Sequence, residues 1–440
     1  MPIILIVAVL VSLMCALPVY AQDSDTETLK RRIEELEERT RRLEKDVLKE
    51  HTRMLEDMKL HLETLERNLA MVDYRTGRLR AMEERLEAFT IGGDLTMFLQ
   101  AVADNPAGPD GAEGSYSADL FLMAPAGLYG NVYFRGNIGE GDGIVPSLPA
   151  MFSGPNADLE FNQPVFNLVE AWYWTEFPLP DTRDRRLELT IGKIDPTALF
   201  DTNRVANSET DQFAANIFVN NIAIDFGGDD NYYGAGLSVA YRFTSIYNKG
   251  LKVTGRVGIF EGDGDFKDIL DRPFAIAELD IWRPYYGLNG NYRFYIWTNE
   301  TAHTDPADPS ANDLSNRGVG MSIDQEVSTD VALFLRYGIQ RERAAQFDMS
   351  ISAGIQILGN SWKRGNDRLG MAYGMTRVSS PYRESTSEVD ADYEHHAEVY
   401  YKWWANKNLS VTPDIQYVAN AGGVSGNDLF IYGARMQLAF

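Results

Sequence analysis

The chain has 440 residues, a formal net charge of −23 and an aromatic content of 11%. Most of the negative charge lies in residues 90–440, whereas acidic and basic residues are nearly balanced in residues 23–89. A chain this acidic is not expected to bind nucleic acid, because contact with phosphates requires a basic surface.

Residues 1–21 have the features of a secretory signal peptide. An apolar run over residues 3–17 is followed by Pro18-Val19-Tyr20-Ala21, with small residues before the expected cleavage point. The only cysteine, Cys15, lies inside this segment, so the mature chain is expected to have no disulfide and no thiol chemistry. We predict cleavage after Ala21 and export.

No stretch of about 20 apolar residues follows the signal. A location in a membrane therefore requires a closed β-barrel, the other architecture that satisfies every backbone hydrogen bond in lipid. The 22 Tyr, 21 Phe and 7 Trp residues would supply the aromatic girdles of such a barrel.

Residues 22–89 are predicted to form an α-helical coiled coil in the periplasm. Apolar residues recur there at heptad spacing in two registers, which meet near residues 48–51. These residues are Leu29, Ile33, Leu36, Leu43 and Val47, then Leu48, Leu55, Met58, Leu62, Leu65, Leu69, Val72, Leu79 and Leu86. So narrow an apolar face requires partner helices, and we expect a homotrimer; a single solvated helix is the alternative.

From Thr90 onward the hydrophobic period falls to two, which is typical of β-strands. Sixteen such segments are predicted at residues 90–103, 115–125, 127–138, 164–178, 185–195, 232–245, 251–261, 272–284, 286–299, 317–329, 331–342, 349–360, 366–378, 392–405, 408–420 and 428–440. A soluble sheet would show the same alternation in any one strand. The large number of such segments after an export signal favours one all-β membrane barrel of about 16 antiparallel strands over residues 90–440.

The last segment shows the pattern most clearly. Phe430, Tyr432, Ala434, Met436, Leu438 and Phe440 fall on one face of the strand, and Arg435 and Gln437 fall on the other. We predict that the apolar face meets lipid and that Phe440 marks the seam where the last strand pairs with the strand beginning near Thr90.

If the apolar faces meet lipid, the polar faces line the lumen. The predicted pore-lining and sugar-contact residues are Arg135, Glu170, Trp172, Trp174, Arg186, Arg242, Arg256, Glu278, Trp282, Arg293, Trp297, Arg336 and Arg435. Aromatic rings stack on the apolar faces of sugars, while arginine and carboxylate groups bind hydroxyls. The alternative is that these charges merely neutralise one another along a solvated wall.

Residues 195–221 interrupt the alternation with a connection long enough to be functional. Gly192-Lys193-Ile194-Asp195, Phe200-Asp201-Thr202-Asn203, Asn207-Ser208-Glu209, Gln212-Phe213 and Asn220-Asn221, together with residues 409–418, resemble the carbohydrate-selective (OprB-type) porin family. The resemblance implies a sixteen-stranded barrel constricted by an inward loop. The residues expected in this constriction loop are Asp201, Asn203, Arg204, Asn207, Glu209, Gln212 and Phe213.

Candidate catalytic and metal-binding residues are sparse. The adjacent His395 and His396 fall on opposite faces of a strand, and the five histidines suggest neither a catalytic triad nor a zinc site. The acidic run at residues 261–265 departs from the EF-hand pattern, so we interpret it as a solvated loop. We expect no enzymatic activity, no cofactor and no metal.

The sequence therefore predicts a passive outer-membrane porin for carbohydrates or other small polar solutes, surrounded by outer-membrane lipid. One alternative is a general diffusion pore that prefers cations, because residues 90–440 are strongly acidic. The other is a tether to the cell wall, in which the coiled coil binds peptidoglycan and the pore is incidental.

Overall fold

The computed structural model describes residues 23–87, 89–127, 129–157, 164–179, 185–228, 232–245 and 250–440. The predicted signal peptide lies outside these ranges, as does most of the connection at residues 179–184. The chain divides into two compact units, residues 1–84 and 85–440.

The first unit contains helix α2 (Asp23–Glu87), close to the helical range that the heptads predict. Among the residues whose burial is described, the heptad positions between Ile33 and Leu69 are exposed: Ile33 is 50% exposed, Leu55 65% and Leu65 64%. Charged pairs such as Arg42 and Glu38, at 2.7 Å, follow the other faces of the helix. The helix is thus confirmed, whereas its pairing into a coiled coil stays a prediction. Within the described residues, no helix combines the length and apolar character needed to span a membrane.

The described part of the second unit contains sixteen strands, and each overlaps a predicted segment. They are β1 (Thr90–Ala103), β2 (Gly111–Ala126), β3 (Gly130–Glu140), β4 (Asn167–Pro178), β5 (Arg185–Ile194), β6 (Gly234–Thr244), β7 (Lys252–Phe260), β8 (Phe274–Trp282), β9 (Gly290–His303), β10 (Leu314–Glu326), β11 (Val331–Gln340), β12 (Phe347–Gly359), β13 (Arg364–Val378), β14 (Tyr393–Trp404), β15 (Leu409–Ala419) and β16 (Leu429–Ala439).

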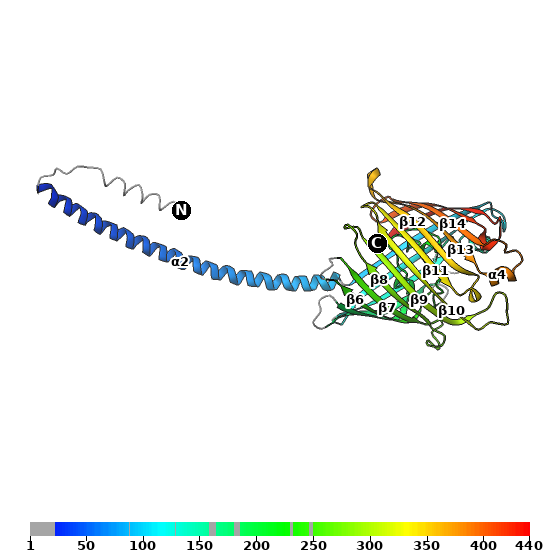
Figure 1. Ribbon diagram of the computed structural model, residues 1–440. Helices are drawn as coiled ribbons and strands as arrows, with labels where there is room; N and C mark the ends of the chain where they lie inside the picture. Colours follow the sequence, from blue (N-terminus) through cyan, green and yellow to red (C-terminus); the bar gives the residue numbers. More distant parts are fainter. Residues whose placement is uncertain are drawn as a thin grey trace. The chain divides into compact units, whose positions relative to one another are not determined.

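Each strand pairs antiparallel with its sequence neighbours, and β1 pairs with β16 to close the barrel (Figure 1). The seam is formed at the predicted residue: the Gly93 N–H donates to the Phe440 carbonyl at 3.1 Å, and the Phe440 N–H donates to the Gly93 carbonyl at 3.0 Å. Closure removes the unpaired strand edges, which cannot exist in lipid.

The two faces of β16 differ as the sequence predicts. Tyr432 is 48% exposed and Leu438 41% exposed on the outer face, whereas Ile431 and Arg435 are buried on the inner face. An apolar outer surface around a polar interior is the arrangement of an outer-membrane barrel.

The connections differ in length at the two ends of the barrel. The end where β1 begins has short turns, such as residues 405–408 between β14 and β15. The other end has long connections, which contain η1 (Val145–Ser147), η2 (Pro196–Ala198), α3 (Asn216–Val219), η3 (Glu342–Ala344), α4 (Ser380–Ser385) and η5 (Ala421–Gly423); η4 (Asn360–Trp362) lies in a turn at the short end. Short turns are typical of the periplasmic side and long loops of the external side.

Candidate pore constriction

Residues 195–228, between β5 and β6, fold into the barrel and are held against the wall by Arg336 of β11. The Arg336 Nε donates to the Asp201 carboxylate at 2.9 Å, and its two Nη atoms donate to the carbonyls of Asp201, Ala206 and Phe218 at 2.9, 2.5 and 2.5 Å. Asn207 accepts a further bond at 3.2 Å. Arg336 is 1% exposed, so it is an anchor for the loop rather than the lumen-lining residue that the alternation predicts.

Asp201 is the acceptor at the centre of this anchor. Besides Arg336, its carboxylate accepts hydrogen bonds from the Tyr295 hydroxyl at 2.9 Å and the Asn221 N–H at 2.7 Å. The Asp201 N–H donates to Glu278 at 2.8 Å. Burial raises the pKa of Asp201, and the neighbouring Arg336 guanidinium opposes this shift. The residue predicted to constrict the pore thus fixes the loop to the wall.

Two glycines of the wall let the loop approach closely. A Cβ atom at Gly338 would lie 2.6 Å from the Asn221 side chain, and one at Gly320 would lie 3.0 Å from it. Any larger residue at Gly338 would push Asn221 away from the wall. The paired asparagines of the sequence therefore mark a second point of attachment.

The middle of the loop, residues 209–215, is fixed to β14 and β16. Glu398 accepts the N–H groups of Ala214 and Ala215 at 2.7 and 3.0 Å. Arg435 donates to the Gln212 carbonyl at 2.5 Å and also to the Glu209 carbonyl. Arg435 is 1% exposed, so it too is an anchor and not open lumen wall.

Apolar packing completes this attachment. Phe213 is fully buried, with its ring centroid 5.6 Å from that of Phe334 and 4.9 Å from that of Tyr400. Trp297, predicted to face the lumen, is 2% exposed within an inner cluster that includes Phe200 and Phe274. Both aromatic side chains stabilise the loop and are not available to a solute.

A second inward segment, residues 150–157 between β3 and β4, contacts both the constriction loop and β14. The Phe152 and Ser153 N–H groups donate to the buried Glu394 carboxylate at 2.9 and 2.8 Å. The Ala157 N–H donates to the Ala214 carbonyl at 2.9 Å, which joins the two segments. This segment was not predicted, because no periodicity or motif in the sequence distinguishes it from an external loop.

These attachments lie on β8 to β16, and the space that stays open lies against β1 to β3. A cavity of about 470 Å³ is present there. Its lining includes Asp94, Asp119, Tyr133 and Arg135 of the wall, Asn156 of the second segment, and Asp195, Thr197, Glu209, Asn220, Tyr232 and Tyr233. Of the predicted residues, Arg135, Asn207 and Glu209 line this constriction. Asp94 and Asp119 were missed, although both occupy polar positions in alternating strands.

Arg135 is the cation at the constriction. Its Nε lies 3.6 Å from Asp119 and 3.3 Å from Glu170, and its Nη2 donates to the Tyr233 hydroxyl. Beside it, the Trp172 ring stacks on Tyr133 at 4.6 Å, and the Trp172 Nε1 donates to Glu170 at 3.0 Å. The wall therefore presents a fixed guanidinium between carboxylates and next to stacked aromatic rings.

Glu209 faces this wall from the loop. Burial raises its pKa to about 7, and Asp195 contributes to the shift, while Arg135 and Arg435 oppose it. Because the protonated carboxyl is neutral, the constriction becomes less negative as the pH falls through 7. Glu209 is therefore a member of the predicted constriction loop whose charge changes near neutral pH.

Several other predicted residues lie near the short-turn end. Arg186 and Arg242 both pair with Glu176, and Arg242 and Arg256 both pair with Glu188. A second cavity, of about 540 Å³, is lined by Arg186, Arg242 and Trp282. The Trp282 ring lies 4.4 Å from the Lys252 Nζ. Trp174 is partly exposed on the same wall.

The remaining predicted residues belong to the loop's attachment. Glu278 and Arg293 are buried, and Arg293 pairs with Asp324 at 2.9 Å. Asn203 donates to the Ser322 hydroxyl at 3.1 Å, and the Arg204 Nε lies 3.4 Å from Asp324. Gln212 donates to the Arg204 carbonyl and accepts from the Asn207 N–H, which braces the loop internally.

Comparisons with known proteins agree with this architecture. Residues 54–440 match the carbohydrate-selective porin, OprB family. Among solved structures, the high-pH structure of Pseudomonas putida OprB has a TM-score of 0.69 at 16% identity, over 84% of this chain and 97% of that chain. The low-pH structure of the same protein has a TM-score of 0.44 at 15% identity over the same shares. No curated protein sequence gives a significant match. Because the family match spans most of the chain, the protein belongs to the carbohydrate-selective porin family of OprB and is an outer-membrane channel.

Proposed function

We propose that the channel carries neutral sugars or similar small polyhydroxylated solutes passively through the constriction beside Arg135. The observation that supports this proposal is the group formed by Arg135, Glu170, Tyr133 and Trp172. Guanidinium and carboxylate groups bind pairs of hydroxyls, and aromatic rings stack on the C–H face of a pyranose.

Sugar blockade of the ion current tests this function. Addition of maltooligosaccharides to single channels in planar bilayers is expected to produce saturable blockade. Arg135→Gln should weaken the apparent sugar affinity by about tenfold, because loss of one charged hydrogen-bonding group costs about 1.5 kcal/mol or more. The matched control is Arg377→Gln, since Arg377 pairs with Asp348 at 2.8 Å away from the cavity. Unblocked current at all sugar concentrations would contradict the proposal.

The carboxylates at the constriction favour a second function, diffusion with a preference for cations. Asp94, Asp119, Asp195 and Glu209 line the cavity against the single cation Arg135 among its described residues. The two functions are compatible, because a neutral sugar and a cation are selected by different properties of the same opening.

We further propose that α2 forms a trimeric coiled coil in the periplasm, since β1 begins at the short-turn end and the described heptad residues between Ile33 and Leu69 are exposed. Cys15 is the only cysteine and lies in the predicted signal, so the mature chain is expected to have none. A single cysteine introduced into α2 can therefore form a disulfide only with the same residue of another copy. Leu62→Cys is expected to give intermolecular disulfides in oxidised outer membranes, whereas Glu63→Cys, on another face, should give far fewer. Equal crosslinking of both variants, or monomers only, would overturn the trimer.

A further inference from the structure

The residue after β7, Glu261, has an unusual environment for a carboxylate. Its side chain is 1% exposed. One oxygen, Oε2, accepts the Ala235 N–H at 3.2 Å, whereas Oε1 is buried and has no hydrogen-bond donor among the described residues. A buried carboxylate oxygen without a donor is unfavourable, so this oxygen points to a missing positive partner.

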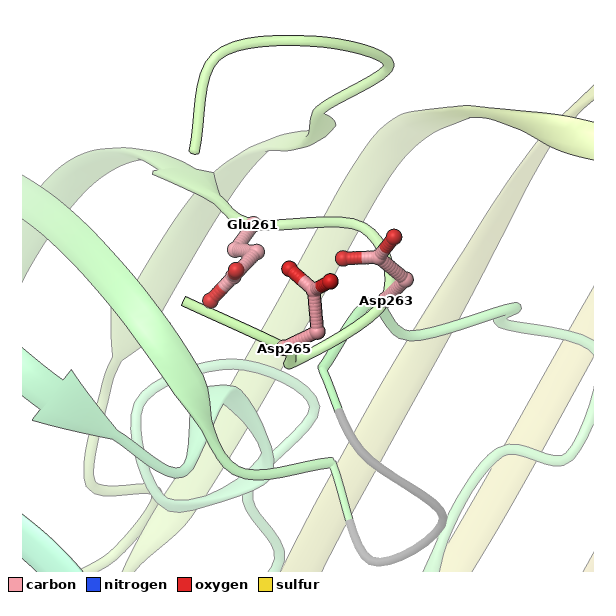
Figure 2. A group of neighbouring side chains, drawn as sticks. All are labelled: Glu261, Asp263 and Asp265. Carbon is pink, nitrogen blue, oxygen red and sulfur yellow. The ribbon is translucent and has the colours of Figure 1, made fainter. Parts of the chain in front are cut away.

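Two further carboxylates come within reach of Glu261 from the connection that follows β7. Asp263 and Asp265 each offer an oxygen, and the three oxygens lie within 4.8 Å of one another (Figure 2). Calcium binds oxygens at about 2.3–2.6 Å, so its ligands lie at most about 5 Å apart. The alternation of acidic residues with Gly262 and Gly264 lets all three side chains turn toward one point.

We propose that Glu261, Asp263 and Asp265 form a calcium site on the long-connection side of the barrel. An all-oxygen set of three carboxylates without histidine or cysteine suits a hard divalent cation. Calcium is favoured over magnesium because three carboxylates on one short segment do not impose the strict octahedral geometry that magnesium requires. The departure of residues 261–265 from the EF-hand pattern led to the prediction of a solvated loop. The observation that supports a site is instead the burial of Glu261, which the spacing of acidic residues does not indicate.

Lys267 is a basic side chain next to this cluster, and it pairs with Asp265. Its Nζ lies 3.0 Å from the Asp265 Oδ2, and its backbone N–H donates to the Asp265 Oδ1 at 2.7 Å. This contact is exposed, and it leaves the buried Glu261 Oε1 without a hydrogen-bond partner among the described residues. A divalent ion therefore competes with a surface lysine that is held weakly.

The position of the site gives calcium a structural role. The Gly262 carbonyl accepts the Gly228 N–H at 3.2 Å, and the Glu261 N–H donates to the Ala235 carbonyl at 2.8 Å. Gly228 lies at the end of the constriction loop, and Ala235 lies at the start of β6. An ion bound at Glu261 thus joins the connection between β7 and β8 to the return of the constriction loop.

Calorimetric titration of the full-length protein in detergent with CaCl₂ tests the proposal. We expect one saturable site with Kd of about 10⁻⁴ to 10⁻³ M, the range of extracellular calcium modules, and at least tenfold weaker binding of MgCl₂. Glu261→Gln keeps the bond to Ala235 but removes the charge, and it should weaken calcium binding at least tenfold.

The controls separate this site from the general acidity of the loop. Asp271→Asn removes one charge from the same connection, outside the three clustered carboxylates, and should weaken calcium binding far less than Glu261→Gln does. If Glu261→Gln does not fold, the exposed pair Asp263→Asn and Asp265→Asn provides the same test. No saturable binding, or equal Kd values for the parent protein and the cluster variants, would overturn the proposal.

Discussion

Replacement of Arg336 with methionine is expected to release the constriction loop and increase single-channel conductance. The substitution leaves the Asp201 carboxylate buried without its cation and removes donors from the carbonyls of Ala206 and Phe218. Breaking a buried ion pair by removing one partner costs about 3–5 kcal/mol. That cost raises the population of a detached loop by about 10²-fold to 10³-fold or more.

Arg377→Met is the matched control, because Arg377 is exposed and pairs with Asp348. It should leave conductance unchanged. The double variant Arg336→Met with Asp201→Leu removes the uncompensated charge and is expected to recover part of the anchoring. Unaltered conductance and unaltered protease resistance of the loop in Arg336→Met would show that the other attachments suffice without Arg336.

Neutralisation of Asp94 and Asp119 is expected to produce the second large effect, a loss of cation preference. Both carboxylates line the cavity, opposite Glu209. A unit charge about 4 Å from an ion contributes about 1 kcal/mol in water, so removal of two should lower the permeability ratio of K⁺ to Cl⁻ by up to about thirtyfold at low salt. The measurement is the reversal potential in a KCl gradient.

The control is Asp348→Asn, which also neutralises an aspartate but lies outside the cavity, where Asp348 pairs with Arg377. The experiment is made at pH 8, where Glu209 is ionised, and at pH 6, where it is mostly protonated. Cation preference should therefore be lower at pH 6 in the parent protein. A ratio that is equal in the parent and the Asp94→Asn, Asp119→Asn variant would place the selective charges elsewhere.

The sixteen strands could be predicted because alternation is a local property. In β16, the outward Tyr432 and Leu438 and the inward Arg435 follow directly from the period of two. The seam at Phe440 was predictable for the same reason, since a closed barrel requires its last strand to pair with its first. The helical range of α2 likewise follows from its heptads. Its pairing with other helices stays a prediction, because a local pattern within one chain does not specify a partner.

The constriction could be predicted only in part. The long connection with Asp201 and Glu209 was identified, but its attachment was not, because hydrogen bonds such as that from Arg336 to Asp201 join residues 135 positions apart. The second inward segment at residues 150–157 gave no signal at all. Its contacts with Glu394 are made by backbone N–H groups, which every sequence has.

The sequence by itself determined which face of each strand a side chain occupies, and so placed Arg135, Arg336 and Arg435 on the inner surface. Tertiary structure alone decided that Arg135 lines the opening while the other two lie buried beneath the loop. The physical reason is that the loop must satisfy its own carbonyls and the Asp201 carboxylate inside the barrel. These hydrogen bonds are made by side chains between β8 and β16, where Arg336 and Arg435 donate to the loop and glycines allow its close approach. The open cavity is therefore lined by the wall of β1 to β3.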